Sequence, residues 1–172
     1  GDILINMDSE DEGELYVGCA GGVNTNAVIR FGKDEVPPNY IAYRISLTGL
    51  KGGHSGLDIH LGRGNANKIM NQLLMQGSRQ FGVRLASIEG GSLRNAIPRE
   101  SFAVVVVPDA KKDEFKAFVA DFEKENQAEF KEADPGLLIA VDRTTMPANL
   151  IDEKTTLGLY QAVDKCPNGV IA

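Results

Sequence analysis

The chain has 172 residues, 42% of them apolar, so it can bury a hydrophobic core of its own, and one globular domain is the expected count. Its net charge of -6 at pH 7 excludes a surface built to bind nucleic acid or anionic lipid, because either partner requires clustered lysine and arginine. Cys19 and Cys166 lack the spacing of a structural zinc site or a disulfide framework, and no apolar run approaches the ~18 residues that cross a bilayer. We therefore expect a cytoplasmic protein with no membrane partner.

Residues 40–48 form the first clear element, a half-buried strand in which apolar and polar side chains alternate with a period of two. The expected inward set is Ile41, Tyr43, Ile45 and Leu47. A helix is expected next, over residues 64–80, because apolar side chains recur there at helical spacing and Phe81-Gly82 marks an exit.

The remainder of the chain contains three more expected strands and two more expected helices. Residues 83–89 alternate as a strand, and residues 102–107 are almost wholly apolar and β-branched, which is typical of a strand covered on both faces. Asp109 is the expected N-cap of an amphipathic helix that ends at Pro135-Gly136, and residues 137–141 form another strand. Asp152 is expected to cap a last helix.

The order from residue 40 to residue 141 is therefore β-α-β-β-α-β. This order predicts an α+β fold of the ferredoxin-like split βαβ type, in which an antiparallel sheet carries two main helices on one face. Extra strands and a C-terminal helix complete the expected architecture.

An acidic run, Asp8-Ser-Glu-Asp-Glu-Gly-Glu14, follows the strand-like residues 3–5. By base rate it is a solvated turn. An EF-hand is excluded, because the twelfth position of such a loop would be Cys19 and not a bidentate glutamate. The remaining interpretation is that one carboxylate at the strand end ligates zinc, although a single carboxylate cannot make a site.

Both histidines of the chain fall in a glycine-rich segment, residues 52–65. His54 and His60 stand six positions apart with Gly56 between them, so they do not share one helical face and are not expected to bind a metal by themselves. We expect Asp58, His60 and Arg63 to hold this segment in shape and to cap the following helix. His54, flanked by glycines, has the chemistry to stabilise a developing oxyanion.

A second polar segment, residues 90–99, lies between two expected strands. It is either a simple hairpin connection in which Asn95 bonds its own backbone, or a site at which Asn95 and Arg99 face a ligand carboxylate. The chain contains no arrangement suited to a Ser-His-Asp triad and no phosphate-binding GxxxxGK[ST] loop.

Three segments carry a family resemblance: NMDSEDEGELYVGCAGG, LKGGHSGLDIHLGRGNAN and GGSLRNAIPRE. Their sequences and order resemble the Xaa-His dipeptidase branch of the M20 metallopeptidases. The resemblance implies a longer enzyme with a zinc-binding catalytic domain into which a lid domain is inserted. Residues 1–14 would end the catalytic domain before the insertion, residues 15–165 would form the lid, and residues 166–172 would begin the return to the catalytic domain.

The resemblance also assigns roles to individual residues. Asp8 would be one ligand of a site for two Zn²⁺ ions, and the other ligands would lie outside these residues. His54 would polarise the scissile carbonyl of a short peptide such as Xaa-His, and Asn95 would contact the substrate. The arginine that many M20 lids carry on the following strand is replaced here by an apolar run, residues 103–107, so Arg99 is the expected substitute.

Two functions follow from these observations. The first is a lid fragment of a zinc metallodipeptidase, inactive alone, whose partners are a short peptide, its own catalytic domain and, in a homodimer, a second copy of itself. The alternative is a free-standing ferredoxin-like domain that binds another protein or a small ligand.

Overall fold

The computed structural model describes residues 2–3, 5, 12–18 and 21–170. It divides the chain into two compact units, Gly1–Arg30 and Phe31–Ala172. The described residues of the first unit contain a turn at Glu12 and Gly13 but no helix or strand, and the side chains of Leu15 and Val17 are 89% and 94% exposed. All the helices and strands described below belong to the second unit.

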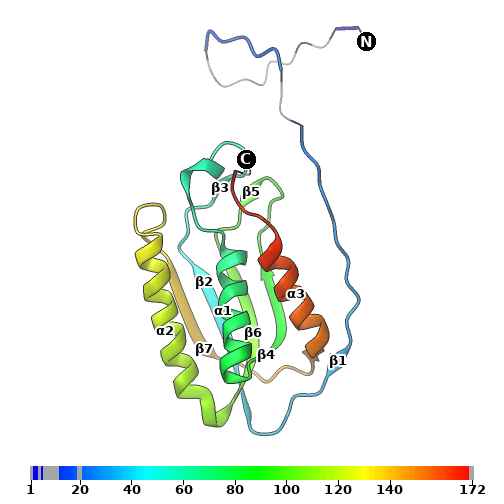
Figure 1. Ribbon diagram of the computed structural model, residues 1–172, viewed down its shortest axis with the longest axis vertical. Helices are drawn as coiled ribbons and strands as arrows, with labels where there is room; N and C mark the ends of the chain where they lie inside the picture. The colour runs from blue at the N-terminus through cyan, green and yellow to red at the C-terminus, as the bar shows by residue number, and fades with distance from the viewer. Residues whose placement is uncertain (1, 4, 6–11, 19–20, 171–172) are drawn as a thin grey trace. The chain divides into compact units, whose positions relative to one another are not determined.

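The second unit is organised around a four-stranded antiparallel sheet with the order β4-β6-β2-β7 (Figure 1). The strands are β2, Tyr40–Thr48; β4, Arg84–Gly90; β6, Ser101–Pro108; and β7, Leu138–Arg143. Ile45 of β2 stands opposite Ala103 on one side and Val141 on the other. In chain order the strands stand second, third, first and fourth across the sheet, so the ferredoxin-like prediction is confirmed.

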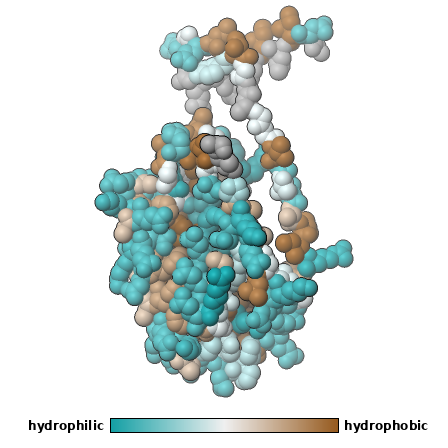
Figure 2. All heavy atoms as spheres, viewed as in Figure 1, coloured by the Kyte–Doolittle hydropathy of each residue, from teal (hydrophilic) through white to brown (hydrophobic). Residues whose placement is uncertain are grey.

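Helices α1, Ala66–Phe81, and α2, Lys112–Glu129, pack against one face of this sheet, and the C-terminal helix α3, Glu153–Lys165, lies beside α1 (Figure 1). Their apolar sides meet the inward side chains of β2, which are the predicted Tyr43, Ile45 and Leu47 with Ile41 partly buried. Tyr160 of α3 belongs to the same core. The outward surfaces of these helices are mostly hydrophilic in Figure 2.

A small second cluster covers the opposite face of the sheet at one end. There Val106 of β6 and Ala42 of β2 pack with Leu150, which belongs to the short strand β8, Leu150–Ile151. That strand pairs with β1, Lys33–Asp34. Val105 and Val107 of β6 face the main core, and Val106 faces this second cluster. Strand β6 is thus covered on both faces, which explains its almost wholly apolar sequence.

The helix ends confirm one expected cap, at Asp152, show an unexpected one, at Asn65, and correct a third, at Asp109. The Asn65 side chain caps α1 by accepting from the Asn67 and Lys68 backbone N–H groups, and Asp152 caps α3 by accepting from Thr155 N at 2.9 Å. Asp109 is not the N-cap of α2: it begins a single 3-10 turn, η2 (Asp109–Lys111), and its carboxylate pairs with Lys112 Nζ at 2.7 Å. The chain makes this extra turn first, so α2 starts at Lys112, and it ends at Glu129, before the Pro135-Gly136 turn.

Among the described residues, none of the helices combines the length and the apolar character that crossing a bilayer requires.

Candidate functional site

Two short strands bring the histidine segment and the second polar segment together. Strand β3, Gly53–His54, pairs antiparallel with β5, Ala96–Ile97, and Ser55 N donates to the carbonyl oxygen of Asn95 at 2.8 Å. A groove of about 640 Å³ runs along this junction toward the start of β6. His54, Asn95 and Arg99 all line it, so three residues predicted from two separate segments share one site.

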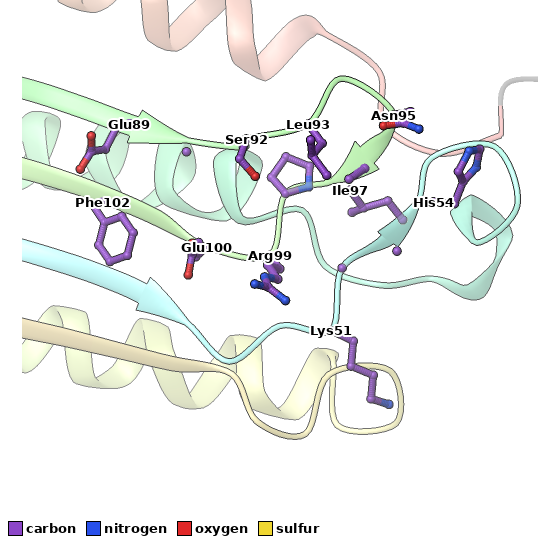
Figure 3. A pocket seen from close by; sticks show the side chains of 16 residues that line it. Lys51, His54, Glu89, Ser92, Leu93, Asn95, Ile97, Arg99, Glu100 and Phe102 are labelled. Atoms are coloured by element: carbon purple, nitrogen blue, oxygen red, sulfur yellow. The ribbon is translucent and has the colours of Figure 1, made fainter.

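Figure 3 shows the order of the side chains along the groove. His54 and Asn95 lie at one end, Arg99 and Glu100 lie farther along, and Phe102 is at the other end. Lys51 and Arg99 contribute positive charge to the lining, and Glu89 and Glu100 contribute negative charge. The groove therefore offers both signs of charge at separate points and one imidazole at its end.

The orientation of the His54 ring is set by its own loop. Its Nδ1 atom accepts hydrogen bonds from Gly56 N at 3.0 Å and Leu57 N at 3.1 Å. Because both partners are backbone donors, Nδ1 must act as an acceptor, and the neutral ring carries its proton on Nε2. The exposed His54 side chain thus has one defined hydrogen-bond donor, the Nε2–H group.

A carboxylate and a guanidinium hold the loop around His54. Asp58 Oδ2 accepts from His54 N at 2.8 Å and lies 3.4 Å from Arg63 Nη1, which itself donates to Gly52 O at 2.5 Å. Gly53 makes room for this pair, since its φ is +142° and a Cβ there would lie 2.5 Å from Asp58 Oδ2. The predicted loop-holding roles of Asp58 and Arg63 are confirmed.

The same prediction is wrong for His60. It is exposed on the one-turn 3-10 helix η1, Ile59–Leu61, and its side chain forms no hydrogen bond or ion pair within the part of the chain that the structure describes. The helix cap expected from this segment is made instead by Asn65.

The side chains of Asn95 and Arg99 are both exposed and likewise make no hydrogen bond or ion pair with any described residue. Only the backbone of Asn95 is engaged, through its carbonyl oxygen. The Asn95 side chain therefore does not bond its own backbone, contrary to the hairpin alternative, and its amide remains available in the groove, as does the Arg99 guanidinium.

The sequence reasoning missed Asp134, which lies in the turn between α2 and β7. Its side chain is fully buried, and its two oxygens accept from Lys51 N and Gly64 N, each at 2.6 Å. The available signal was an acidic residue directly before Pro135-Gly136, which indicated only a turn. Its partners lie 83 and 70 positions away along the chain, so no local pattern could have identified them.

A metal site is not formed by the described residues, among which no group of three or more His, Cys, Asp or Glu side chains lies close enough to hold an ion. The predicted ligand Asp8 lies outside the described residues. His54 Nδ1 is already occupied by backbone donors, and His60 has no ligand-bearing neighbour in such a group.

Comparison with known proteins gives a consistent family. A family model described as the peptidase dimerisation domain of M20 peptidases matches residues 45–134. The cytosol non-specific dipeptidase of Escherichia coli (strain K12) is 39% identical over 170 residues, which are 99% of this chain and 35% of that protein. The crystal structure of aminoacylhistidine dipeptidase from Vibrio alginolyticus has a TM-score of 0.81 and 33% identity, over 84% of this chain and 29% of that one.

The chain thus spans about a third of the length of these relatives. The matched range contains the histidine segment and the second polar segment, and it ends at Asp134, whose carboxylate bonds both ends of the histidine segment. Fold, segment order and family model agree, and this chain belongs to the M20 family of peptidase dimerisation domains.

Proposed function

We propose that this chain is the lid portion of a dinuclear zinc dipeptidase that hydrolyses short peptides such as Xaa-His. The observation that carries the proposal is the His54 ring, whose Nδ1 is held by two backbone donors so that Nε2–H is free at the end of a groove shared with Asn95 and Arg99. The names of the relatives, a cytosol non-specific dipeptidase and an aminoacylhistidine dipeptidase, support the same reaction class.

In this proposal His54 acts on the scissile carbonyl. Its Nε2–H group donates to the carbonyl oxygen, and the hydrogen bond strengthens as negative charge develops on that oxygen in the tetrahedral transition state. The ring does not have to reorganise, because the loop already fixes its proton on the outward nitrogen. Catalysis gains from such a fixed donor because no orientation cost remains at the moment of reaction.

Asn95 and Arg99 bind the rest of the substrate. The Asn95 amide supplies neutral donors beside His54, and the Arg99 guanidinium supplies a planar charged fork suited to a peptide carboxylate. Their separation along the groove orients the peptide with its scissile bond near His54 and its carboxylate farther along (Figure 3).

The proposal requires that the zinc ligands lie outside the described residues. The described residues do not make a metal site, and their part in the reaction is donation by His54 and binding by Asn95 and Arg99. We propose Asp8 as one ligand and a catalytic domain outside these residues as the source of the others. Residues 1–14 would then belong to that domain, residues 15–165 to the lid, and residues 166–172 to the return segment, and the isolated chain would be inactive.

The family description, a peptidase dimerisation domain, supports two partners: the chain's own catalytic domain and a second copy of the same subunit. We propose a cytoplasmic location, which the name of the Escherichia coli relative, the net charge and the cysteine pattern support.

The test compares the His54→Ala and His60→Ala variants in the complete dipeptidase that contains this chain, with an Xaa-His dipeptide as substrate. We expect His54→Ala to lower kcat on the order of 100- to 1000-fold, as removal of an oxyanion donor does elsewhere, without changing the zinc content. His60→Ala is the matched control, since His60 is exposed in the same segment and should leave kcat unchanged. An unaltered kcat in His54→Ala would remove the proposed role of His54.

A second measurement tests the fragment assignment. The isolated chain, assayed with the same dipeptide and added Zn²⁺, should release no histidine. Hydrolysis by the isolated chain would contradict the proposal that the catalytic ligands lie elsewhere.

A further inference from the structure

The segment that carries His54 is closed at both ends by a single carboxylate. Asp134 accepts from Lys51 N through Oδ1 and from Gly64 N through Oδ2, with both distances at 2.6 Å. The Asp134 side chain is fully buried and is not part of the groove lining. It therefore touches the two ends of the segment but cannot touch a peptide in the groove.

The residues next to these two ends are connected to His54 through a short series of contacts. Gly52 follows Lys51, and Arg63 precedes Gly64; these two residues are joined by the bond from Arg63 Nη1 to Gly52 O at 2.5 Å. Arg63 also lies 3.4 Å from Asp58 Oδ2, the atom that accepts from His54 N. Both ends of the Arg63 to Gly52 bond thus depend on backbone that Asp134 holds.

The burial of Asp134 requires hydrogen-bond donors for both of its carboxylate oxygens. A buried carboxylate must be matched by donors, and here it receives two short backbone hydrogen bonds from residues that are distant in sequence. The turn that carries it is fixed as well, because Asp134 N donates to Phe130 O at 2.7 Å and Leu137 N donates to Asp134 O at 3.1 Å. A rigid turn on the sheet scaffold therefore determines where the histidine segment begins and ends.

We propose that Asp134 is a positioning residue, which fixes the His54 imidazole with its proton on Nε2 by closing the segment from Lys51 to Gly64. It acts through Arg63 and Asp58 and does not contact the substrate. The catalytic significance of this role rests on the function proposed above for His54. The structural role concerns only the ring and its loop, and it can be tested without measuring catalysis.

The experiment uses the ¹⁵N-labelled chain and long-range ¹H–¹⁵N correlation of the imidazole rings, which distinguishes a ring with its proton fixed on Nε2 from one that exchanges between tautomers. The chain has only two histidines, so His60 serves as an internal reference in every spectrum. In the unaltered chain we expect a fixed Nε2–H pattern for His54 and an averaged pattern for the exposed His60.

Asp134→Asn keeps the shape of the side chain but presents its amide N–H₂ to one of the two backbone N–H groups, so at least one of the two bonds is lost. We expect the His54 signals of this variant to move toward the averaged pattern of His60, and the Lys51 and Gly64 amides to exchange with solvent faster, while the His60 signals stay unchanged. Asn71→Ala is the control: it removes another buried hydrogen bond, from Asn71 Nδ2 to Tyr160 O, outside the histidine segment, and should leave His54 unaltered.

A folded Asp134→Asn chain with unaltered His54 signals would overturn the proposal. Should that variant fail to fold, Arg63→Lys decides the question, because it weakens the same connection at a half-buried position and should shift His54 in the same direction. Unaltered His54 signals in Arg63→Lys would then be the overturning result. If instead the NMR shift is observed but His54→Ala leaves kcat of the complete enzyme unaltered, the proposed function fails and the positioning role stands.

In the complete dipeptidase, Asp134→Asn should lower kcat by on the order of 10- to 100-fold through misplacement of the donor. KM should change little, because Asn95 and Arg99 remain in place. A variant that raised KM alone, with kcat unchanged, would contradict a positioning role.

Discussion

Gly49 stands between the end of β2 and the histidine segment, and it makes a close approach that only glycine permits. Its φ is +81°, and a Cβ there would lie 2.7 Å from the Gly136 carbonyl carbon and closer still to its oxygen, whereas real Cβ contacts are essentially never under 3.0 Å. Gly62 offers a matched comparison, because its φ is +67° but a Cβ there would meet nothing within 4 Å. Both alanine variants therefore carry left-handed backbone strain, and only Gly49→Ala adds an overlap with backbone.

The strain should lower the free energy of unfolding by about 1–2 kcal/mol in each variant. The overlap at Gly49 should add about 3 kcal/mol, the upper end of the usual cost of overpacking, because a backbone carbonyl cannot rotate away as a side chain can. For a chain of this size that addition corresponds to a midpoint lower by roughly 6–12 °C than that of Gly62→Ala. Thermal unfolding followed by circular dichroism measures both values, and equal midpoints for the two variants would refute the close approach of Gly49 to Gly136.

Three further outcomes are expected. The pKa of Asp152 is lowered from 3.8, first by the hydrogen bond from the Thr155 backbone. The contribution of this carboxylate to stability is therefore present above about pH 3.8 and is lost as the pH falls through its lower folded-state pKa. Asp152→Asn should flatten the acid end of a plot of unfolding free energy against pH. Burial raises the pKa of Tyr160, and its hydroxyl has no hydrogen-bond partner among the described residues. Tyr160→Phe should therefore keep the free energy of unfolding, measured by urea titration, or raise it by up to about 1 kcal/mol. A clear loss of stability would reveal a partner of the hydroxyl. Lys68 Nζ donates to three backbone carbonyls at the end of α3, each at 2.8 Å. Lys68→Met should therefore speed amide hydrogen exchange in the last turn of α3. Unchanged exchange there would show that these bonds do not hold the helix end.

The main elements could be predicted because each is encoded by its own residues. The alternation over residues 40–48 depends only on the pleat of a strand, and the observed β2 has those bounds. The strands and helices that follow are set by the same local periodicity, and their order leaves few ways to pair the sheet. The start of α2 was misplaced because the acidic residue after Pro108 suits either an N-cap or a first turn, and the extra 3-10 turn is not encoded by spacing.

The candidate site was predictable only in part. His54 and Asn95 stood out by residue type, but their proximity depends on the pairing of β3 with β5, which is too short to leave a pattern in the sequence. The failure at His60 has the same origin: sequence places it beside Asp58 and Arg63, but only the path of the loop decides which of these side chains meet. Asp134 was missed because its partners are backbone N–H groups, which every residue except proline possesses.

Main-chain groups pair β3 with β5, with Gly53 opposite Ile97 and His54 opposite Ala96. Side chains on the rim, such as Leu93 and Asn95, can therefore be exchanged without altering the bonds that hold the two segments together. In the proposed function, substitutions at the rim would change which peptides the groove accepts, while the His54 imidazole keeps its position. In the proposed function, the histidine that acts on the peptide bond and the rim that selects the peptide would therefore be adjacent but could vary independently.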